Sequence, residues 1–166
     1  ELTNATDVFV SGKYLYVAVG GTGGLEIIDI SNPAAPAHKG KILHGSGGAA
    51  LAGASALFVS GNYAYIVSYN NTLEIIDISN PMQPVWKSTL HHGDGGAELR
   101  HPVSVFVSGN YAYIANYGNS NFEIADISDP LNPFHKSTFG YFDSGGSLEG
   151  PLSVFVSCNY AYVTSA

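Results

Sequence analysis

Charged residues are scarce in this sequence, and basic residues are the scarcest. Of 166 residues, 11% are charged, with 6 Lys and Arg against 13 Asp and Glu, so the formal net charge is −7. Proteins that bind nucleic acid contact its phosphates through clustered Lys and Arg, whereas here these residues are scattered along the chain. The composition therefore excludes a nucleic-acid-binding protein and argues against charge-driven adhesion to an anionic membrane.

Long apolar segments and paired cysteines are also missing. No apolar run approaches the roughly 18 residues of a membrane-spanning helix, and the residues after Glu1 do not resemble a signal peptide. We therefore expect a soluble chain, or a mature form that is already trimmed, with no membrane insertion. Cys158 is the single cysteine, so an internal disulfide is excluded and the redox compartment stays open.

A repeat dominates what is present. The motif VFVSGKYLYV and its variants recur in steps of 49, 48 and 49 residues, beginning at Val8, Leu57, Val105 and Val154. The motif LEIIDISNPAAP and its variants recur in steps of 48 and 49 residues, beginning at Leu25, Leu73 and Phe122. Because two independent motifs share one period, the chain holds three complete units and the first half of a fourth.

Each unit contains four predicted strands, which in the third unit are residues 105–108, 111–115, 122–127 and about 134–139. Gly109-Asn110 predicts a tight hairpin, because both residues tolerate positive φ. The first strand is apolar on both faces, the fourth mixes polar residues with aromatics, and no window has apolar residues at helical spacing. Burial is therefore expected to fall from the first strand, on a central axis, to the fourth.

Repeated four-stranded units predict an all-β protein made of β-propeller blades, each of four antiparallel strands. A β-sandwich would show one polar face per strand, and a β-helix coil would be shorter than the 48-residue step. The chain is thus expected to be a single segment of a propeller, a partial propeller. Its blades are predicted at about 6–45, 55–93 and 103–141, with a half blade at about 152–166.

The phrases LEIIDISNPAAP, LEIIDISNPMQP and FEIADISDPLNP, each followed about 20 residues later by a variant of V-x-V-S-G-N-Y-A-Y, resemble the LVIVD-repeat proteins. The resemblance covers nearly the whole chain. It implies a β-propeller of the kind found in bacterial and archaeal surface and secreted proteins, and it implies no shared catalytic set. Departures from the pattern at Ala125, at Lys13-Tyr14-Leu15 and at Cys158, which replaces a turn glycine, leave the expected fold unchanged.

Two recurrent residue types are expected to have structural roles. Asp29, Asp77 and Asp126 each end a strand before Ile-Ser-Asn/Asp-Pro, where an Asp side chain accepts hydrogen bonds from turn N–H groups and the proline ends the strand pairing. Residues repeated in every blade are poor candidates for chemistry, which concentrates in one asymmetric site. Tyrosines two residues apart share a strand face and are expected to pack between blades: Tyr63 and Tyr65, Tyr111 and Tyr113, Tyr160 and Tyr162.

The loops between blades, residues 44–55, 92–104 and 142–153, vary most, and loops on a rigid scaffold often bind ligands. The candidate binding residues are His92, Asp94, Glu98, Arg100, His101, Asp143 and Glu149. Imidazoles suit zinc and carboxylates suit calcium, but no helical frame or cysteine pair holds these side chains. We therefore expect no metal and no cofactor, with a calcium or zinc ion as the alternative.

Catalysis finds little support in the sequence. Gly45-Ser46-Gly47 lacks the strand-to-helix context of a serine nucleophile, and Cys158 has no basic neighbour that would favour a thiolate. We expect a non-enzymatic interaction or structural scaffold. The alternative is a propeller enzyme, or a metal-binding or glycan-binding module that uses the loops, and convergence of His92, Asp94 and His101 in one pocket would favour it.

The last unit contains only its first two strands, whereas propellers need about four to eight blades. An exposed strand edge also promotes association, so the expected partners are further blades of the same protein or other copies of it, as in a filament. A surface glycan or protein is a second kind of partner. The low charge, the neutral polar surface and the family resemblance favour an extracellular or cell-surface location. Two triplets fit the glycosylation pattern, which chance also produces: Asn4-Ala5-Thr6 and Asn70-Asn71-Thr72.

Overall fold

The computed structural model describes residues 3–21, 23–140 and 148–166, which form short strands joined by turns. The strands of the first two units are β1 (Ala5–Ser11), β2 (Tyr14–Val19), β3 (Gly24–Asp29), β4 (Ala37–Leu43), β5 (Ala54–Ser60), β6 (Tyr63–Ser68), β7 (Thr72–Asp77) and β8 (Val85–His91). Those of the third and fourth units are β9 (Pro102–Ser108), β10 (Tyr111–Asn116), β11 (Asn121–Asp126), β12 (Phe134–Gly140), β13 (Pro151–Ser157) and β14 (Tyr160–Ser165).

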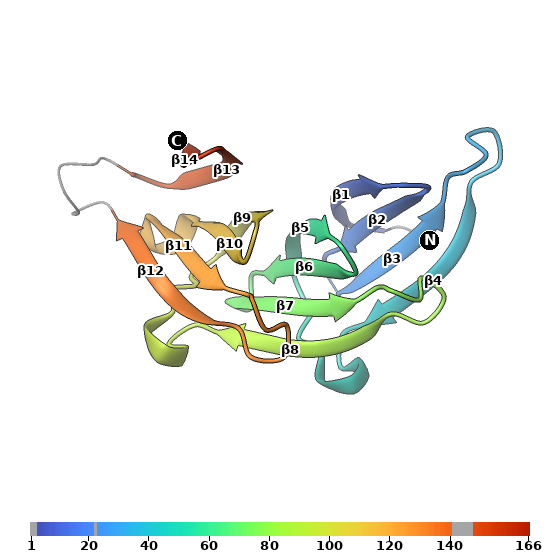
Figure 1. Cartoon of the computed structure of the whole chain (residues 1–166), viewed down its shortest axis with the longest axis horizontal. Coiled ribbons are helices and arrows are strands. Elements are labelled where there is room, and N and C mark those ends of the chain that lie inside the picture. Colours follow the sequence, from blue (N-terminus) through green and yellow to red (C-terminus); the bar gives the residue numbers. More distant parts are fainter. Residues whose placement is uncertain (1–2, 22, 141–147) are drawn as a thin grey trace.

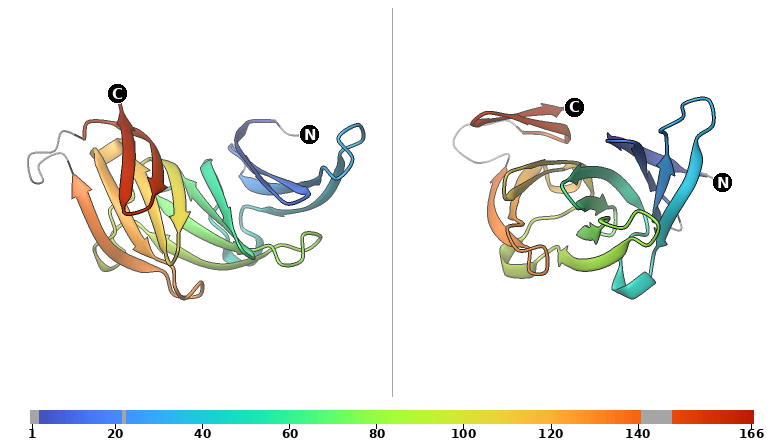
Figure 2. Two further views of the ribbon diagram at one scale, coloured as in Figure 1. Left: turned by 45° about the horizontal axis from the view of Figure 1, so that its top comes forward. Right: turned by 45° about the vertical axis from the view of Figure 1, so that its right-hand side comes forward.

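Each unit folds into a blade in which chain neighbours pair in antiparallel fashion. In the described residues, β1–β4, β5–β8 and β9–β12 are four-stranded sheets, and β13 and β14 form a two-stranded sheet. The blades fan out in an arc, with the first strand of each blade on the inside and β4, β8 and β12 on the outside (Figures 1 and 2). Contacts between β1 and β5, β5 and β9, and β9 and β13 join the blades on the inside. The predicted partial propeller is therefore confirmed.

The hairpin that joins the first two strands of each blade has a two-residue turn. In blade 3, Ser108 lies opposite Tyr111, which leaves Gly109 and Asn110 as the turn. Gly109 has a φ of 58°, and the same position has positive φ in each other blade: 57° at Gly12, 58° at Gly61 and 53° at Cys158. Positive φ is thus confined to the first turn residue, although both residue types tolerate it.

Burial peaks at the second and third strands of a blade. In blade 2, every residue of β6 after Tyr63 is buried, and so is every residue of β7 before Asp77. Phe58 in β5 and Lys87 in β8 are only half-buried. The predicted fall in burial from the first strand to the fourth is therefore wrong, because the first strand lies at the inner margin of the blade while β6 and β7 have a paired strand on each side and a blade against each face.

Single 3-10 turns interrupt the loops, namely η1 (Ser46–Gly48), η2 (Asp94–Gly96) and η3 (Tyr117–Asn119). The sequence predicted no helix, because a turn of three residues leaves no helical spacing of apolar residues. Glycines in the left-handed region shape the first two turns, with φ of 66° at Gly47 and 57° at Gly95. Across the described ranges, no helix is long and apolar enough to cross a membrane.

The hydrophobic cores lie between neighbouring blades. The core between blades 1 and 2 contains side chains from both blades and from the loop that joins them, including Leu25, Ile42, Leu51, Ala64, Ile66, Ile76 and Ile78. The core between blades 2 and 3 contains the equivalent side chains Leu73, Leu90, Leu99, Ala112, Ile114, Ala125 and Ile127. Each interface is therefore built from the same positions of the repeat.

Candidate functional site

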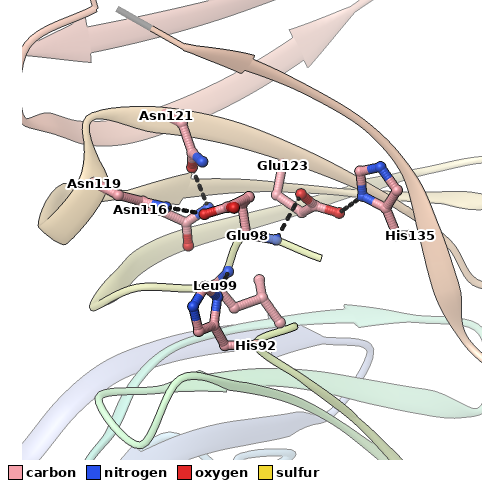
Figure 3. Close-up of polar contacts among 8 residues, drawn as sticks. All are labelled: His92, Glu98, Leu99, Asn116, Asn119, Asn121, Glu123 and His135. Atoms are coloured by element: carbon pink, nitrogen blue, oxygen red, sulfur yellow. Dashed lines mark hydrogen bonds and ion pairs between the residues drawn. The ribbon is translucent and has the colours of Figure 1, made fainter. Parts of the chain in front are cut away.

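A polar cluster lies where the second interblade loop meets blade 3 (Figure 3). It brings together a loop segment that the sequence marked as a candidate binding surface and several buried polar side chains of the blade. The cluster consists of His92 and Glu98 from the loop, Asn116 and Asn121 at the facing ends of β10 and β11, Asn119 in η3, Glu123 on β11 and His135 on β12.

Glu123 is the centre of this cluster. Its side chain is fully buried. The Oε1 atom lies 2.7 Å from His135 Nδ1, and the Oε2 atom accepts a hydrogen bond of 3.1 Å from the backbone N–H of Glu98. Burial raises the pKa of the Glu123 carboxyl group above its usual value, and the hydrogen bond to His135 opposes that rise. The side chain thus ties the interblade loop and the outer strand to one point in the blade.

The same arrangement recurs in the other blades. Glu26 Oε2 lies 2.9 Å from His38 Nε2. Glu74, which is also fully buried, accepts hydrogen bonds from Trp86 Nε1 at 3.1 Å and Thr89 Oγ1 at 2.8 Å, and burial raises its pKa. In each complete blade the glutamate on the third strand therefore meets a side chain twelve residues later on the fourth strand.

Glycines of the interblade loops complete this contact. A Cβ added to Gly48 would lie 3.2 Å from the Trp86 ring, and one added to Gly96 would lie 3.5 Å from the His135 ring. The glutamates were not among the predicted site residues, because each stands in a strand that is otherwise largely apolar. The available signal was a glutamate in every LEI or FEI motif, followed twelve residues later by His or Trp.

His92 closes its own loop. Its Nδ1 accepts a hydrogen bond of 3.2 Å from the backbone N–H of Leu99, and its Nε2 lies 3.2 Å from Arg100 Nε. His44 has the same role in the first loop, where its Nδ1 accepts a hydrogen bond of 3.2 Å from the N–H of Ala52. His44 and His92 are equivalent in the repeat, and each accepts a backbone hydrogen bond from the far side of its own loop, which indicates a structural role for the imidazole.

Asp94 and His101 take different partners. Asp94 Oδ2 accepts a hydrogen bond of 2.9 Å from the backbone N–H of His91, inside the turn. The His101 ring lies edge-on to the Tyr69 ring, with centroids 6.2 Å apart, and its residue has a φ of 45°. Asp94 and His101 thus each contact a residue other than His92.

The other predicted loop residues divide between the cluster and the surface. Glu98 accepts a hydrogen bond of 2.7 Å from Asn119 Nδ2, and so belongs to the cluster. Glu149 is exposed just before β13, and Asp143 lies outside the described residues. Within residues 3–21, 23–140 and 148–166, no three or more His, Cys, Asp or Glu side chains are grouped so that they could hold a metal ion.

The recurrent aspartates hold turns at the end of each third strand. Asp29, Asp77 and Asp126 each accept a hydrogen bond at Oδ1 from the backbone N–H of the serine two residues later, at 3.0, 2.9 and 3.1 Å. Hydrogen bonding to that serine is the largest cause of the lowered pKa of each carboxyl group. Each aspartate therefore fixes the turn before the proline.

Each end of the arc presents an apolar face that no described residue covers. Val8 and Val10 are both 57% exposed, whereas their equivalents in blade 2, Leu57 and Val59, are buried. At the other end, Tyr160 and Tyr162 are 69% and 58% exposed. The predicted packing of tyrosine pairs between blades thus does not extend to this last pair, because the described chain places no further blade against it.

The two uncovered end faces carry different side chains, and these two types pack against each other inside the arc. Inside the arc, Tyr16 of blade 1 shares a core with Leu57 and Val59 of blade 2. The next interface repeats this with Tyr65 against Val105 and Val107. One end of the arc thus carries the tyrosine side of such an interface and the other end carries its aliphatic side.

Comparison with known proteins identifies the repeat. Residues 3–43, 53–91 and 100–140 match a family model described as the LVIVD repeat, which together is more than half of the chain. No curated protein matches the chain.

Solved structures share the fold at low sequence identity. A functionally unknown protein from Desulfotomaculum acetoxidans DSM 771 has a TM-score of 0.73 at 16% identity, over 97% of this chain and 49% of its own. A protein from Lactobacillus plantarum has a TM-score of 0.74 at 17% identity, over 98% and 48%. A protein from Bacteroides uniformis ATCC 8492, provisionally assigned as a 6-phosphogluconolactonase, has a TM-score of 0.75 at 14% identity, over 99% and 51%. The chain spans about half the length of each.

Proposed function

Because this chain belongs to the LVIVD repeat family, we propose that it is a non-enzymatic scaffold that joins further blades, in the same protein or in other copies, through its uncovered end faces. The alternative loop-based function has less support. The loop side chains that suit chemistry, such as His92, Asp94 and Glu98, accept hydrogen bonds from their own loop or blade.

The exposed apolar end faces are the observation that carries this proposal. Val8 and Val10 at one end, and Tyr160 and Tyr162 at the other, each have more than half of their surface exposed. Adjacent apolar side chains left in water favour association, because burial contributes about 25 cal/mol for each Å² removed from water. The same residue types pack together at the interfaces inside the arc, so the two kinds of face suit each other.

An extracellular or cell-surface location is part of the proposal. It is supported by the low content of charged residues, 11%, and by a surface rich in neutral polar groups. Protease treatment of intact cells that express the parent protein tests it. Rapid loss of the protein from intact cells is the expected result, and protection until the cells are lysed would contradict the location.

Sedimentation velocity of the 166-residue chain over a wide concentration range tests the scaffold. We expect the mass to rise with concentration, and Val8→Asp/Val10→Asp to suppress this rise because the charges would be buried at the contact. Ser60→Asp is the matched control, since Ser60 is an exposed residue of β5 inside the arc. A mass equal to one chain at every concentration, with the strand content intact by circular dichroism, would overturn the proposal.

A further inference from the structure

The half blade leaves an apolar pocket against blade 3. The pocket has a volume of about 380 Å³, and its lining consists of Phe122, Phe139, Leu148, Ala161 and Val163. Ala161 and Val163 lie on β14, whose only strand partner among the described residues is β13. The pocket therefore lies beside a sheet edge that is available for pairing.

The lining residues have buried equivalents at both complete interfaces of the arc. Phe122 corresponds to Leu25 and Leu73, Phe139 to Ile42 and Leu90, and Leu148 to Leu51 and Leu99, by the repeat spacing. Ala161 and Val163 correspond to Ala64 and Ile66, and to Ala112 and Ile114. All ten equivalents are buried, whereas Phe139 is 42% exposed. The pocket therefore has the lining of an interblade core, but it lacks some of the side chains that complete such a core at the other two interfaces.

The two complete interfaces show which side chains are missing from the pocket. Between blades 1 and 2 the remaining core residues include Ile76 and Ile78, and between blades 2 and 3 they include Ala125 and Ile127. Both pairs lie on or just after the third strand of the following blade and are two residues apart, so their side chains lie on one face. The third strand of the last blade would supply the equivalent pair.

Building on the scaffold role proposed above, we propose that β14 and this pocket bind one further strand of the repeat sequence, which adds to the sheet edge and places two aliphatic side chains in the pocket. Strand addition of this kind gains affinity from main-chain hydrogen bonds and specificity from alternate side chains. The register follows from blade 3, where Ala112 lies opposite Ala125 and Ile114 opposite Glu123.

The third strands already in the arc cannot be this strand. β3, β7 and β11 each lie between the second and fourth strands of their own blade, so both of their edges are already paired. A second copy of the described residues would therefore have to unfold a blade to supply one. The occupant is instead a separate segment with the Glu-x-Ile-x-Ile or Glu-x-Ala-x-Ile pattern.

A labelled peptide of residues 72–91, which contains the sequences of β7 and β8, provides the probe. We expect saturable binding to the 166-residue chain by fluorescence anisotropy. The peptide with Ile76→Asp/Ile78→Asp should bind about tenfold more weakly or worse, because it cannot bury two aliphatic side chains. Ile75→Ser is the matched control peptide, since Ile75 lies on the opposite strand face and should leave affinity nearly unchanged.

Variants of the chain test the same contact from the other side. Val163→Asp should weaken binding of the peptide, whereas Tyr162→Ser, on the opposite face of β14, should not. Hydrogen exchange of residues 160–165 in the unaltered chain should slow when the peptide is added, which gives a readout independent of any variant. Equal affinity for the Ile76→Asp/Ile78→Asp peptide, or no slowing of exchange, would overturn the inference.

The peptide assay is separable from the test of the scaffold. Val8→Asp/Val10→Asp changes the far end of the arc, so this variant should bind the peptide normally even if it no longer self-associates. Peptide binding without self-association would refute the end-face contact alone. Self-association without peptide binding would refute the strand-binding site alone.

Discussion

Glu123 Oε1 lies 2.7 Å from His135 Nδ1, with the glutamate side chain fully shielded from solvent. The equivalent pair in blade 1, Glu26 and His38, is nearly as close at 2.9 Å, but these side chains are 19% and 57% exposed. The difference follows from the packing, because the loop from blade 2 covers Glu123 and donates the Glu98 N–H to it. Equivalent Glu–His pairs therefore differ in burial according to their place in the arc.

Removal of His135 should destabilise the fold much more than removal of His38. His135→Ala would leave a buried carboxyl group without its 2.7 Å partner, and a buried polar group left unsatisfied costs about 1–3 kcal/mol. His38→Ala is the matched control and should change stability by about 0.5 kcal/mol or less, as exposed ion pairs do. Urea unfolding followed by circular dichroism measures both, and equal effects would contradict the argument.

Glu74 should make stability fall as pH rises. Burial raises the pKa of its carboxyl group in the folded chain above the ordinary value of 4.5, so the folded state holds the proton more tightly than the unfolded state. The contribution of Glu74 to the free energy of unfolding is therefore fully present below pH 4.5 and is lost as pH rises through the pKa of the folded state. Glu74→Gln cannot ionise and keeps an oxygen that accepts from Trp86 and Thr89.

Unfolding free energies of the chain and of Glu74→Gln, measured from pH 4 to pH 8, test this sign. The difference between them should shift in favour of the variant as pH rises. Parallel pH profiles would show that the carboxyl group titrates alike in the folded and unfolded chains.

The fold could be predicted from the sequence because local signals agree with the repeat. Gly109-Asn110 marks the hairpin, and the apolar strands on either side require cover on both faces. The candidate site was less accessible. Glu123 and His135 are twelve residues apart, and their meeting depends on pairing of β11 with β12. The roles of His92 and Glu98 depend on loop geometry, to which hydrophobic periodicity contributes nothing.

His92 should contribute to stability through its loop rather than through a ligand. His92→Ala removes the acceptor for the Leu99 N–H and the partner of Arg100, and we expect a loss of about 1 kcal/mol. His91→Ala is the control, because His91 donates to Asp94 through its backbone N–H. Urea unfolding midpoints compare the two. A stabilising effect of added zinc or calcium that His92→Ala abolishes would instead favour the metal-binding alternative.

Cys158 should destabilise the fourth hairpin. Its φ of 53° matches the 57° and 58° of the glycines at the same turn position in the other blades. A Cβ added to those glycines, Gly12, Gly61 and Gly109, would meet no atom within 4 Å, so the cost of a side chain comes from the backbone conformation and not from crowding. A non-glycine residue in the left-handed region costs about 1 kcal/mol or somewhat more.

Cys158→Gly should therefore slow hydrogen exchange in β13 and β14, by about fivefold for a gain of 1 kcal/mol. Exchange in the hairpin is the appropriate measurement, because β13 and β14 form a two-stranded sheet that can open without the complete blades. Cys158→Ser controls for the thiol, since it keeps a side chain at positive φ and should leave exchange unchanged. Gly109→Ala should produce the reverse effect in blade 3. If Cys158→Ser protects the hairpin as well as Cys158→Gly does, the thiol and not the backbone conformation is the source of the cost.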